Sequence, residues 1–152
     1  AGPAGISGYD SLGPDGLSED FTADYLWQQV HGSRRLIKAL LLDQTCLAGL
    51  GNIYADEALF LAGIRPSRRC SRVTRKESQR LYEAIRTVLT EGLENGGTTV
   101  FNFIDGSGKE AKNQENLRVY GREGQPCPVC GATIVYKKQG GRGTHYCPVC
   151  QK

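Results

Sequence analysis

The sequence of 152 residues predicts a mainly α fold: a small helical bundle followed by a β-hairpin that carries four cysteines. Two observations predict it. Apolar residues recur at helical spacing through much of 18–118. Two Cys-x2-Cys pairs then enclose a sixteen-residue spacer with β-branched residues and glycines. We therefore expect a linker or the remnant of an appended sequence over 1–17, a helical domain over 18–118 and the hairpin over 119–152.

The first three helices follow from local signals. A short helix is expected over 22–30, after the acidic residues Glu19 and Asp20, with Tyr25, Leu26 and Val30 on one side. Residues 36–42 are apolar on most faces, which predicts a buried helix. A third helix is expected from Ile53 to about Ala62, and Gly63 is placed to end it.

The fourth helix has the strongest signal. Thr74 and Glu77 form a capping-box pattern at its start. Asn95-Gly96-Gly97 would end the helix, and we expect a short strand or helical turn over 98–104 and a polar loop over 105–116. Its predicted core residues recur at helical spacing: Leu81, Ile85, Val88, Leu89 and Leu93.

The four hairpin cysteines predict a metal site. Each Cys-x2-Cys turn directs two sulfurs to one point, and two such turns make a closed tetrahedral site that suits one Zn²⁺. Because four thiolates leave no open position, we expect this zinc to be structural. A disulfide pair and a redox Cys-x-x-Cys remain as alternatives. His145 is off the ligand spacing and is expected in a loop or contact. The predicted ligands are Cys127, Cys130, Cys147 and Cys150.

Charge and composition restrict the class of partner. The net charge is +3, and residues 1–33 contain five acids and no Lys or Arg, so 34–152 hold 19 basic residues against 11 acids. Such a basic body favours nucleic acid as the partner, although a merely solvated surface is the alternative. We find no apolar run that would cross a membrane and no secretory signal. Cys46 and Cys70 would be free thiols, which favours a cytosol.

Ala48-Gly49-Leu50-Gly51-Asn52 precedes the third helix and is a candidate anion site. Asn52 is a good N-cap, and the N–H groups of the first turn can bind a phosphate. A simple N-cap is an equally good interpretation. In the hairpin, Arg142 between glycines is placed to bind a phosphate with its guanidinium fork. For Asp56 and Glu57 we expect dipole or supporting hydrogen-bond roles, or that one of them orients the turn while buried.

These residues resemble the helix–two-turns–helix element and zinc finger of bacterial formamidopyrimidine-DNA glycosylases. The resemblance rests on segments in the same order over about residues 9–152: Leu42-Asp43-Gln44, Ala48 to Phe60, Gly96-Gly97-Thr98-Thr99, Val119-Tyr120-Gly121-Arg122 and Arg142 to Gln151.

The resemblance implies the DNA-binding portion of a base-excision-repair glycosylase and AP lyase that acts on oxidised purines such as 8-oxoguanine. Such enzymes flip the damaged nucleotide out of the duplex. The partner would be damaged or abasic double-stranded DNA, and the protein a monomer in the bacterial cytoplasm at the nucleoid. The resemblance implies these contacts with the DNA backbone: Asn52, Arg142, Lys38, Tyr120, Gly51 and Lys109.

Two departures from the family affect the chemistry. The family's nucleophile is an N-terminal proline followed by glutamate, whereas this chain begins Ala1-Gly2-Pro3. We therefore expect this chain alone to be inactive and to contain no catalytic residue. The stretch 109–114 also lacks the Gly-x-Phe-like run of the lesion-covering loop. Two alternatives are an intact enzyme with its chemistry inside these residues and a zinc-ribbon adaptor outside DNA repair.

Overall fold

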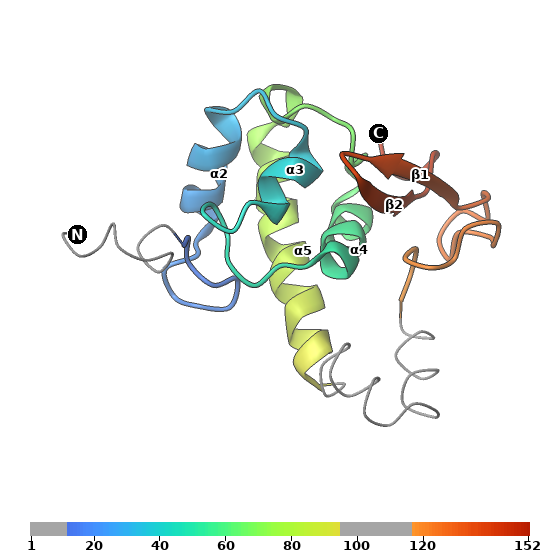
Figure 1. Ribbon diagram of the computed structural model, residues 1–152, viewed down its shortest axis with the longest axis horizontal. Helices are drawn as coiled ribbons and strands as arrows, with labels where there is room; N and C mark the ends of the chain where they lie inside the picture. Colours follow the sequence, from blue (N-terminus) through green and yellow to red (C-terminus); the bar gives the residue numbers. More distant parts are fainter. Residues whose placement is uncertain (1–11, 95–116) are drawn as a thin grey trace.

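The computed structural model describes residues 12–94 and 117–152, which form a helical unit with a two-stranded hairpin against one side (Figure 1). In these residues the elements are α2 (Ala23–His31), α3 (Ile37–Leu42), α4 (Asn52–Ala62), the 3-10 turn η1 (Cys70–Arg72), α5 (Arg75–Glu94), β1 (Val135–Gln139) and β2 (Arg142–Tyr146). The mainly α fold with a terminal hairpin is confirmed.

The long helix α5 is the support for the other helices. Both α2 and α4 pack on α5, and α3 packs on α4 (Figure 1). Burial of the apolar stripe drives this packing. Leu81, Ile85 and Val88 are fully or almost fully buried, and Leu89 packs partly buried against them, as predicted. Leu93 is 70% exposed, so its predicted core role is wrong.

The predicted helix ends are largely present. Thr22 caps α2, because its Oγ1 accepts a hydrogen bond from the Tyr25 N–H at 3.0 Å. At the start of α5 the Thr74 N–H donates to Glu77 Oε1 (3.0 Å), and the Glu77 N–H donates to Thr74 Oγ1 (3.1 Å). This reciprocal pair is the capping box. Gly63 ends α4 in the left-handed conformation (φ 75°), which glycine adopts without a steric penalty.

Residues 13–17 are part of the folded unit. The Gly13 N–H donates to the Gln44 carbonyl at 2.8 Å, and the Ala48 N–H donates to the Pro14 carbonyl at 2.9 Å. Asp15 and Ala48 also form a parallel bridge. Residues 13–17, which we predicted as part of a linker over 1–17, therefore belong to the folded unit. The loop before α4 provides the backbone hydrogen-bond partners of residues 13–17, and the composition of residues 13–17 alone does not reveal them.

The hairpin has its own small core. Strands β1 and β2 are antiparallel, Gln139 pairs with Arg142, and Gly140-Gly141 make the turn with positive φ angles. A second apolar cluster lies beneath the hairpin and includes one side chain from α4; its members are Phe60, Val119, Cys127, Ile134 and Cys147. The shared Phe60 joins this small core to the helical unit.

Some predictions lie outside the described residues: Lys109, the end of the fourth helix at 95–97 and the segments 98–104 and 105–116. No helix in 12–94 or 117–152 combines the length and the apolar character that crossing a bilayer requires.

Cys46 and Cys70 are free, buried thiols, and burial is the main cause that raises the pKa of Cys46 to about 11. Cys46 is therefore a packing residue at neutral pH.

Candidate nucleic-acid interface

The four hairpin cysteines converge as predicted. Their sulfurs all lie within 4.8 Å of one another, with Cys127 and Cys150 3.8 Å apart and Cys130 and Cys147 3.4 Å apart. Tetrahedral zinc with bonds of about 2.3 Å would set sulfurs roughly 3.8 Å apart, so the residues fit the ion. The Val129 N–H also donates to Cys127 Sγ. The finger holds one structural zinc, which would brace the hairpin without taking part in chemistry.

Glu57 fixes the chain where it enters the finger. Its carboxylate is 1% exposed and accepts three successive backbone N–H groups, those of Arg118 (2.8 Å), Val119 (2.8 Å) and Tyr120 (3.0 Å). The Arg118 guanidinium also contacts Glu57 and binds both oxygens of Glu91. A single helical carboxylate therefore orients the 118–120 turn rather than the turn before its own helix.

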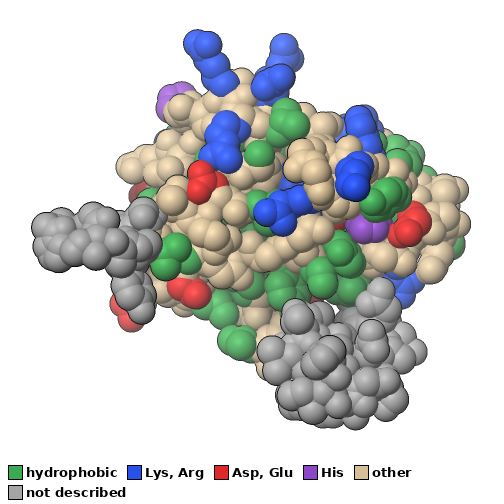
Figure 2. All heavy atoms as spheres, viewed as in Figure 1, with side chains coloured by type: hydrophobic (Ala, Val, Ile, Leu, Met, Phe, Trp, Pro, Cys, Tyr) green, Lys and Arg blue, Asp and Glu red, His purple; other side chains and the backbone are tan. Residues whose placement is uncertain are grey.

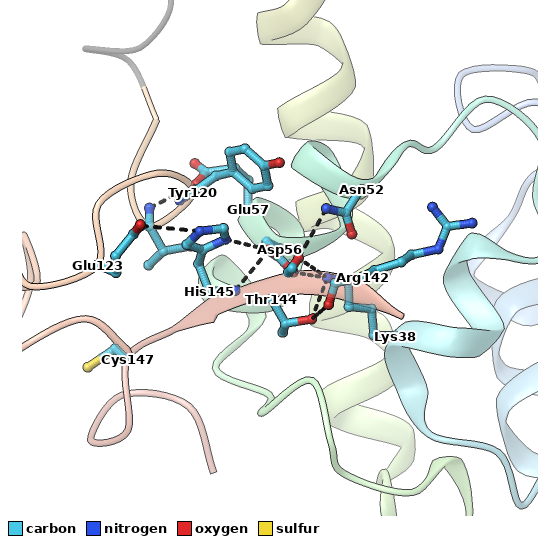
Figure 3. A network of polar contacts seen from close by, with 12 residues as sticks. Lys38, Asn52, Asp56, Glu57, Tyr120, Glu123, Arg142, Thr144, His145 and Cys147 are labelled. Carbon is cyan, nitrogen blue, oxygen red and sulfur yellow. Dashed lines mark hydrogen bonds and ion pairs between the residues drawn. The ribbon is translucent and has the colours of Figure 1, made fainter. Parts of the chain in front are cut away.

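Asp56, the preceding residue of α4, fixes the second strand of the hairpin. Its Oδ2 accepts the His145 N–H at 3.0 Å and lies 3.2 Å from His145 Nδ1, while its Oδ1 lies 2.8 Å from Lys38 Nζ (Figure 3). His145 Nε2 contacts Glu123 at 3.3 Å. His145 is thus a buried strand residue rather than a loop residue, and it supports β2 without being a zinc ligand.

Lys38 reaches three partners from α3. Its ammonium donates to Thr144 Oγ1 (2.8 Å) and to the Gly143 carbonyl (3.1 Å), besides pairing with Asp56. Burial is the main cause that lowers the pKa of Lys38 and raises that of Asp56; in both cases the partner's charge opposes the shift. This network therefore holds two charged groups at a cost in desolvation.

Asn52 and Arg142 meet at the same place. The Asn52 Nδ2 donates to the Gly143 carbonyl at 3.1 Å, the same oxygen that accepts from Lys38. Gly143 follows Arg142 directly in β2, and the Arg142 side chain extends away from the buried network (Figure 3). Arg142 is exposed, so its fork faces solvent. The start of α4 and the finger thus bring the two residues predicted to contact phosphates close together.

Two details differ from the sequence-based expectations. Gly51, not Asn52, is the N-cap of α4, because the Asn52 amide bonds across to the finger instead of capping its own helix. Lys38, predicted to contact the DNA backbone, is only 2% exposed, and its ammonium donates two hydrogen bonds within the protein and forms an ion pair with Asp56. This geometry favours a supporting role for Lys38 over a direct contact.

Two further predicted contacts, Gly51 and Tyr120, lie near the same site, and Lys109 lies outside the described residues. Gly51 is exposed at the start of α4, and the N–H groups of the first turn follow it. Tyr120 is half-buried, and its ring packs at a tilt against that of His145 with centroids 4.5 Å apart. The sequence did not predict that the Gly143 carbonyl accepts hydrogen bonds from both Lys38 and Asn52. The only available signal was an Asp-Glu pair inside an otherwise apolar helix.

A basic face surrounds these residues. Figure 2 shows Lys and Arg side chains over the upper part of the viewed face, with few acids among them. A groove of about 530 Å³ lies between α3 and the tip of the hairpin, and Arg35 and Arg142 line it. Arg35 forms an ion pair with Asp43, with its Nη1 2.7 Å from Asp43 Oδ2. Arg142 therefore lies in a groove with further basic residues, as a polyanion partner would require.

Comparison with protein families matches both parts of the chain. Residues 12–103 match the formamidopyrimidine-DNA glycosylase H2TH domain. Residues 124–152 match the zinc finger found in FPG and IleRS. The first match spans more than half of the sequence, and the two together cover the helical unit and the finger.

Individual proteins agree with the family matches. The chain is 54% identical over 148 residues to the formamidopyrimidine-DNA glycosylase of Pelotomaculum thermopropionicum, covering 97% of this chain and 54% of that protein. The fold is similar to crystal structures of MutM (Fpg) from Thermus thermophilus (TM-score 0.82, 44% identity) and of Lactococcus lactis Fpg in complex with DNA containing an abasic site (TM-score 0.83, 37% identity). Each structural match covers 93% of this chain and 54% or 52% of the other. The chain thus spans about half the length of these relatives.

Proposed function

The chain belongs to the formamidopyrimidine-DNA glycosylase family, and on that premise we propose that it is the DNA-binding portion of a base-excision-repair glycosylase and AP lyase acting on oxidised purines. Its partner is damaged or abasic double-stranded DNA. In this proposal the protein is a monomer that works at the bacterial nucleoid. The second interpretation, an adaptor outside DNA repair, is favoured by none of the matches.

One observation supports the proposal most: the Gly143 carbonyl joins the two candidate phosphate contacts. Asn52 bonds to it, and Arg142 precedes it in the strand. One residue comes from a helix start and the other from the finger, so the two can hold neighbouring phosphates of one strand. Such contacts fix the position of a duplex without reading its sequence, which suits an enzyme that must find damage in any sequence.

In this proposal the buried carboxylates keep the two phosphate contacts in fixed relation. Glu57 anchors the turn that carries Tyr120, and Asp56 anchors β2. A rigid pair of contacts holds the backbone on both sides of a nucleotide that leaves the stack, and the energy of unstacking is a few kcal/mol. The chain therefore binds and orients the DNA backbone, and we do not assign excision of the base to these residues.

Salt dependence tests the proposal. If about four phosphates are neutralised, log K against log salt has a slope of roughly −3 to −4. The measurement is fluorescence anisotropy of a labelled duplex with one abasic-site analogue, titrated at several salt concentrations. Competition with undamaged duplex and with RNA identifies the preferred ligand. A slope near zero, or a preference for RNA, would contradict the proposal.

Substitution of Arg142 locates the site. Arg142→Ala should weaken duplex binding by about 1–3 kcal/mol, because a charge-assisted hydrogen bond to phosphate is lost. Lys76→Ala is the charge-matched control, since Lys76 is exposed in the first turn of α5. Equal losses for the two variants would mean that only net charge matters and that Arg142 has no place in the site.

A further inference from the structure

We propose that Asp56 is a positioning residue for the phosphate grip: through Lys38 and the backbone of His145 it holds β2 so that Arg142 stays in register with Asn52. The inference rests on the proposed function and assigns a role within that site. Asp56 touches no phosphate itself, because it is fully buried.

The first step is the path from Asp56 to Arg142. Asp56 Oδ2 accepts the His145 N–H at 3.0 Å, three residues after Arg142. Asp56 Oδ1 pairs with Lys38 Nζ at 2.8 Å, and the same ammonium donates to Gly143 O and Thr144 Oγ1. Every residue of β2 from 143 to 145 is therefore tied to α3 or α4 through this carboxylate and its partner (Figure 3).

The second step is the position of Asn52 in the same assembly. Asn52 lies at the start of α4, one turn before Asp56, and donates to Gly143 O at 3.1 Å. That carbonyl has room for both donors because a carbonyl oxygen has two lone pairs. When the Lys38 bond holds the carbonyl in place, the Asn52 amide is aimed as well. Asp56 thus acts on both phosphate contacts through one oxygen atom.

The third step concerns why the pair is charged. A buried Lys–Asp pair contributes little net stability, since desolvation of the two groups offsets their attraction. An apolar pair would pack the same space. The charged pair differs in requiring one geometry, because the Lys38 ammonium must reach Asp56 while it donates to Gly143 O and Thr144 Oγ1. Lys38 and Asp56 are 2% and 0% exposed, so water cannot take over these bonds. Their distinctive contribution is orientation of the strand.

The experiment is a double-mutant cycle in the zinc-loaded chain. Asp56→Asn keeps an oxygen for the His145 N–H but removes the charge that pairs with Lys38. We expect it to weaken binding of the abasic-analogue duplex on the order of tenfold. In an Arg142→Ala background the same change should cost clearly less than tenfold, because one of the two phosphate contacts through which Asp56 acts is then absent.

The sign of the effect separates positioning from electrostatics. Asp56→Asn makes the chain more positive by one charge, which by itself would tighten DNA binding. The matched control is Asp20→Asn, an equal change of charge at an exposed acid. Positioning predicts weaker binding for the first variant and equal or tighter binding for the second. Unchanged or tighter binding by Asp56→Asn would overturn the proposal, and so would a tenfold loss that persists without Arg142.

Folding is checked in the same samples by helical circular dichroism and by zinc content. A loss of binding that only follows the unfolded fraction would also overturn the proposal. If Asp56→Asn does not fold, the same cycle is run with Lys38→Met, which removes the ion pair and leaves the Asp56 bonds to His145. The wild type could bind duplex normally and Arg142→Ala could weaken binding, while Asp56→Asn has no effect. That result would refute this inference but leave the proposed function intact. A wild-type chain that does not bind duplex would remove the proposed function and this inference together.

Discussion

Replacement of Glu57 by glutamine tests how the finger is anchored to the helices. Glutamine has the same shape as glutamate, but one carboxylate oxygen becomes an NH2 group. In the wild type, Oε2 accepts the Val119 and Tyr120 N–H groups and Oε1 accepts that of Arg118. With the amide oxygen toward Val119 and Tyr120, the NH2 group faces the Arg118 N–H, and two donors are opposed.

The magnitude follows from this count. One hydrogen bond to a charged group is lost, at about 1.5–3 kcal/mol, and the two that remain lose their charge assistance. Arg118 is partly exposed, so water relieves some of the loss at its N–H. We therefore expect Glu57→Gln to lower the free energy of unfolding by about 2–3 kcal/mol. The opposite amide orientation is worse, because it opposes the fully buried Val119 N–H.

The assay is urea unfolding at constant free zinc, since the ion contributes to stability by mass action. The control is Glu91→Gln, which removes the other carboxylate partner of the Arg118 guanidinium. Glu91 is 40% exposed, so this control should cost less than about 1 kcal/mol. A Glu57→Gln variant within about 0.5 kcal/mol of the wild type would refute the role assigned to these three hydrogen bonds.

Three further predictions concern the metal, acid stability and a helix cap. Removing zinc with a chelator should abolish duplex binding while the helical circular dichroism signal persists, because the main core lies in the helices; retained binding would contradict the site. Hydrogen bonds from Thr45 and then Arg35 lower the pKa of Asp43 from 3.8 to about 2. This stabilisation is complete above about pH 4 and is lost as the pH falls to 2. The Asp43 side chain is partly exposed, so this effect is small. Between about pH 4 and pH 2 the free energy of unfolding of the wild type should fall by less than about 1 kcal/mol more than that of Asp43→Asn, as measured by acid-induced unfolding. Thr74→Ala should lower stability by about 1 kcal/mol in urea unfolding by removing the α5 cap, and no change would argue against the capping box.

The sequence was sufficient for features that depend on local chemistry. The zinc ligands, the capping box of α5 and the stop at Gly63 need only spacing and residue type, and each is present in the structure. The Asn52 cap was wrong because tertiary contact with Gly143 O competes with local capping, and Gly51 takes that place. No local rule reveals a partner 91 residues away.

The buried charges show the same limit. Lys38 has the residue type of a phosphate contact, and its burial depends on a strand more than 100 residues further along the chain. Asp56 and Glu57 stand out in α4 as polar residues in an apolar helix, which signals a special role but not its direction. Their assignments to β2 and to the 118–120 turn required the structure.

Phe60 makes the finger inseparable from its support. This side chain of α4 lies 6% exposed among Val119, Ile134 and two of the zinc-binding cysteines. A peptide that contained only 119–152 would expose an apolar hollow where that ring belongs, whatever its metal content. Transplanting the finger to another scaffold would therefore require carrying the α4 surface with it.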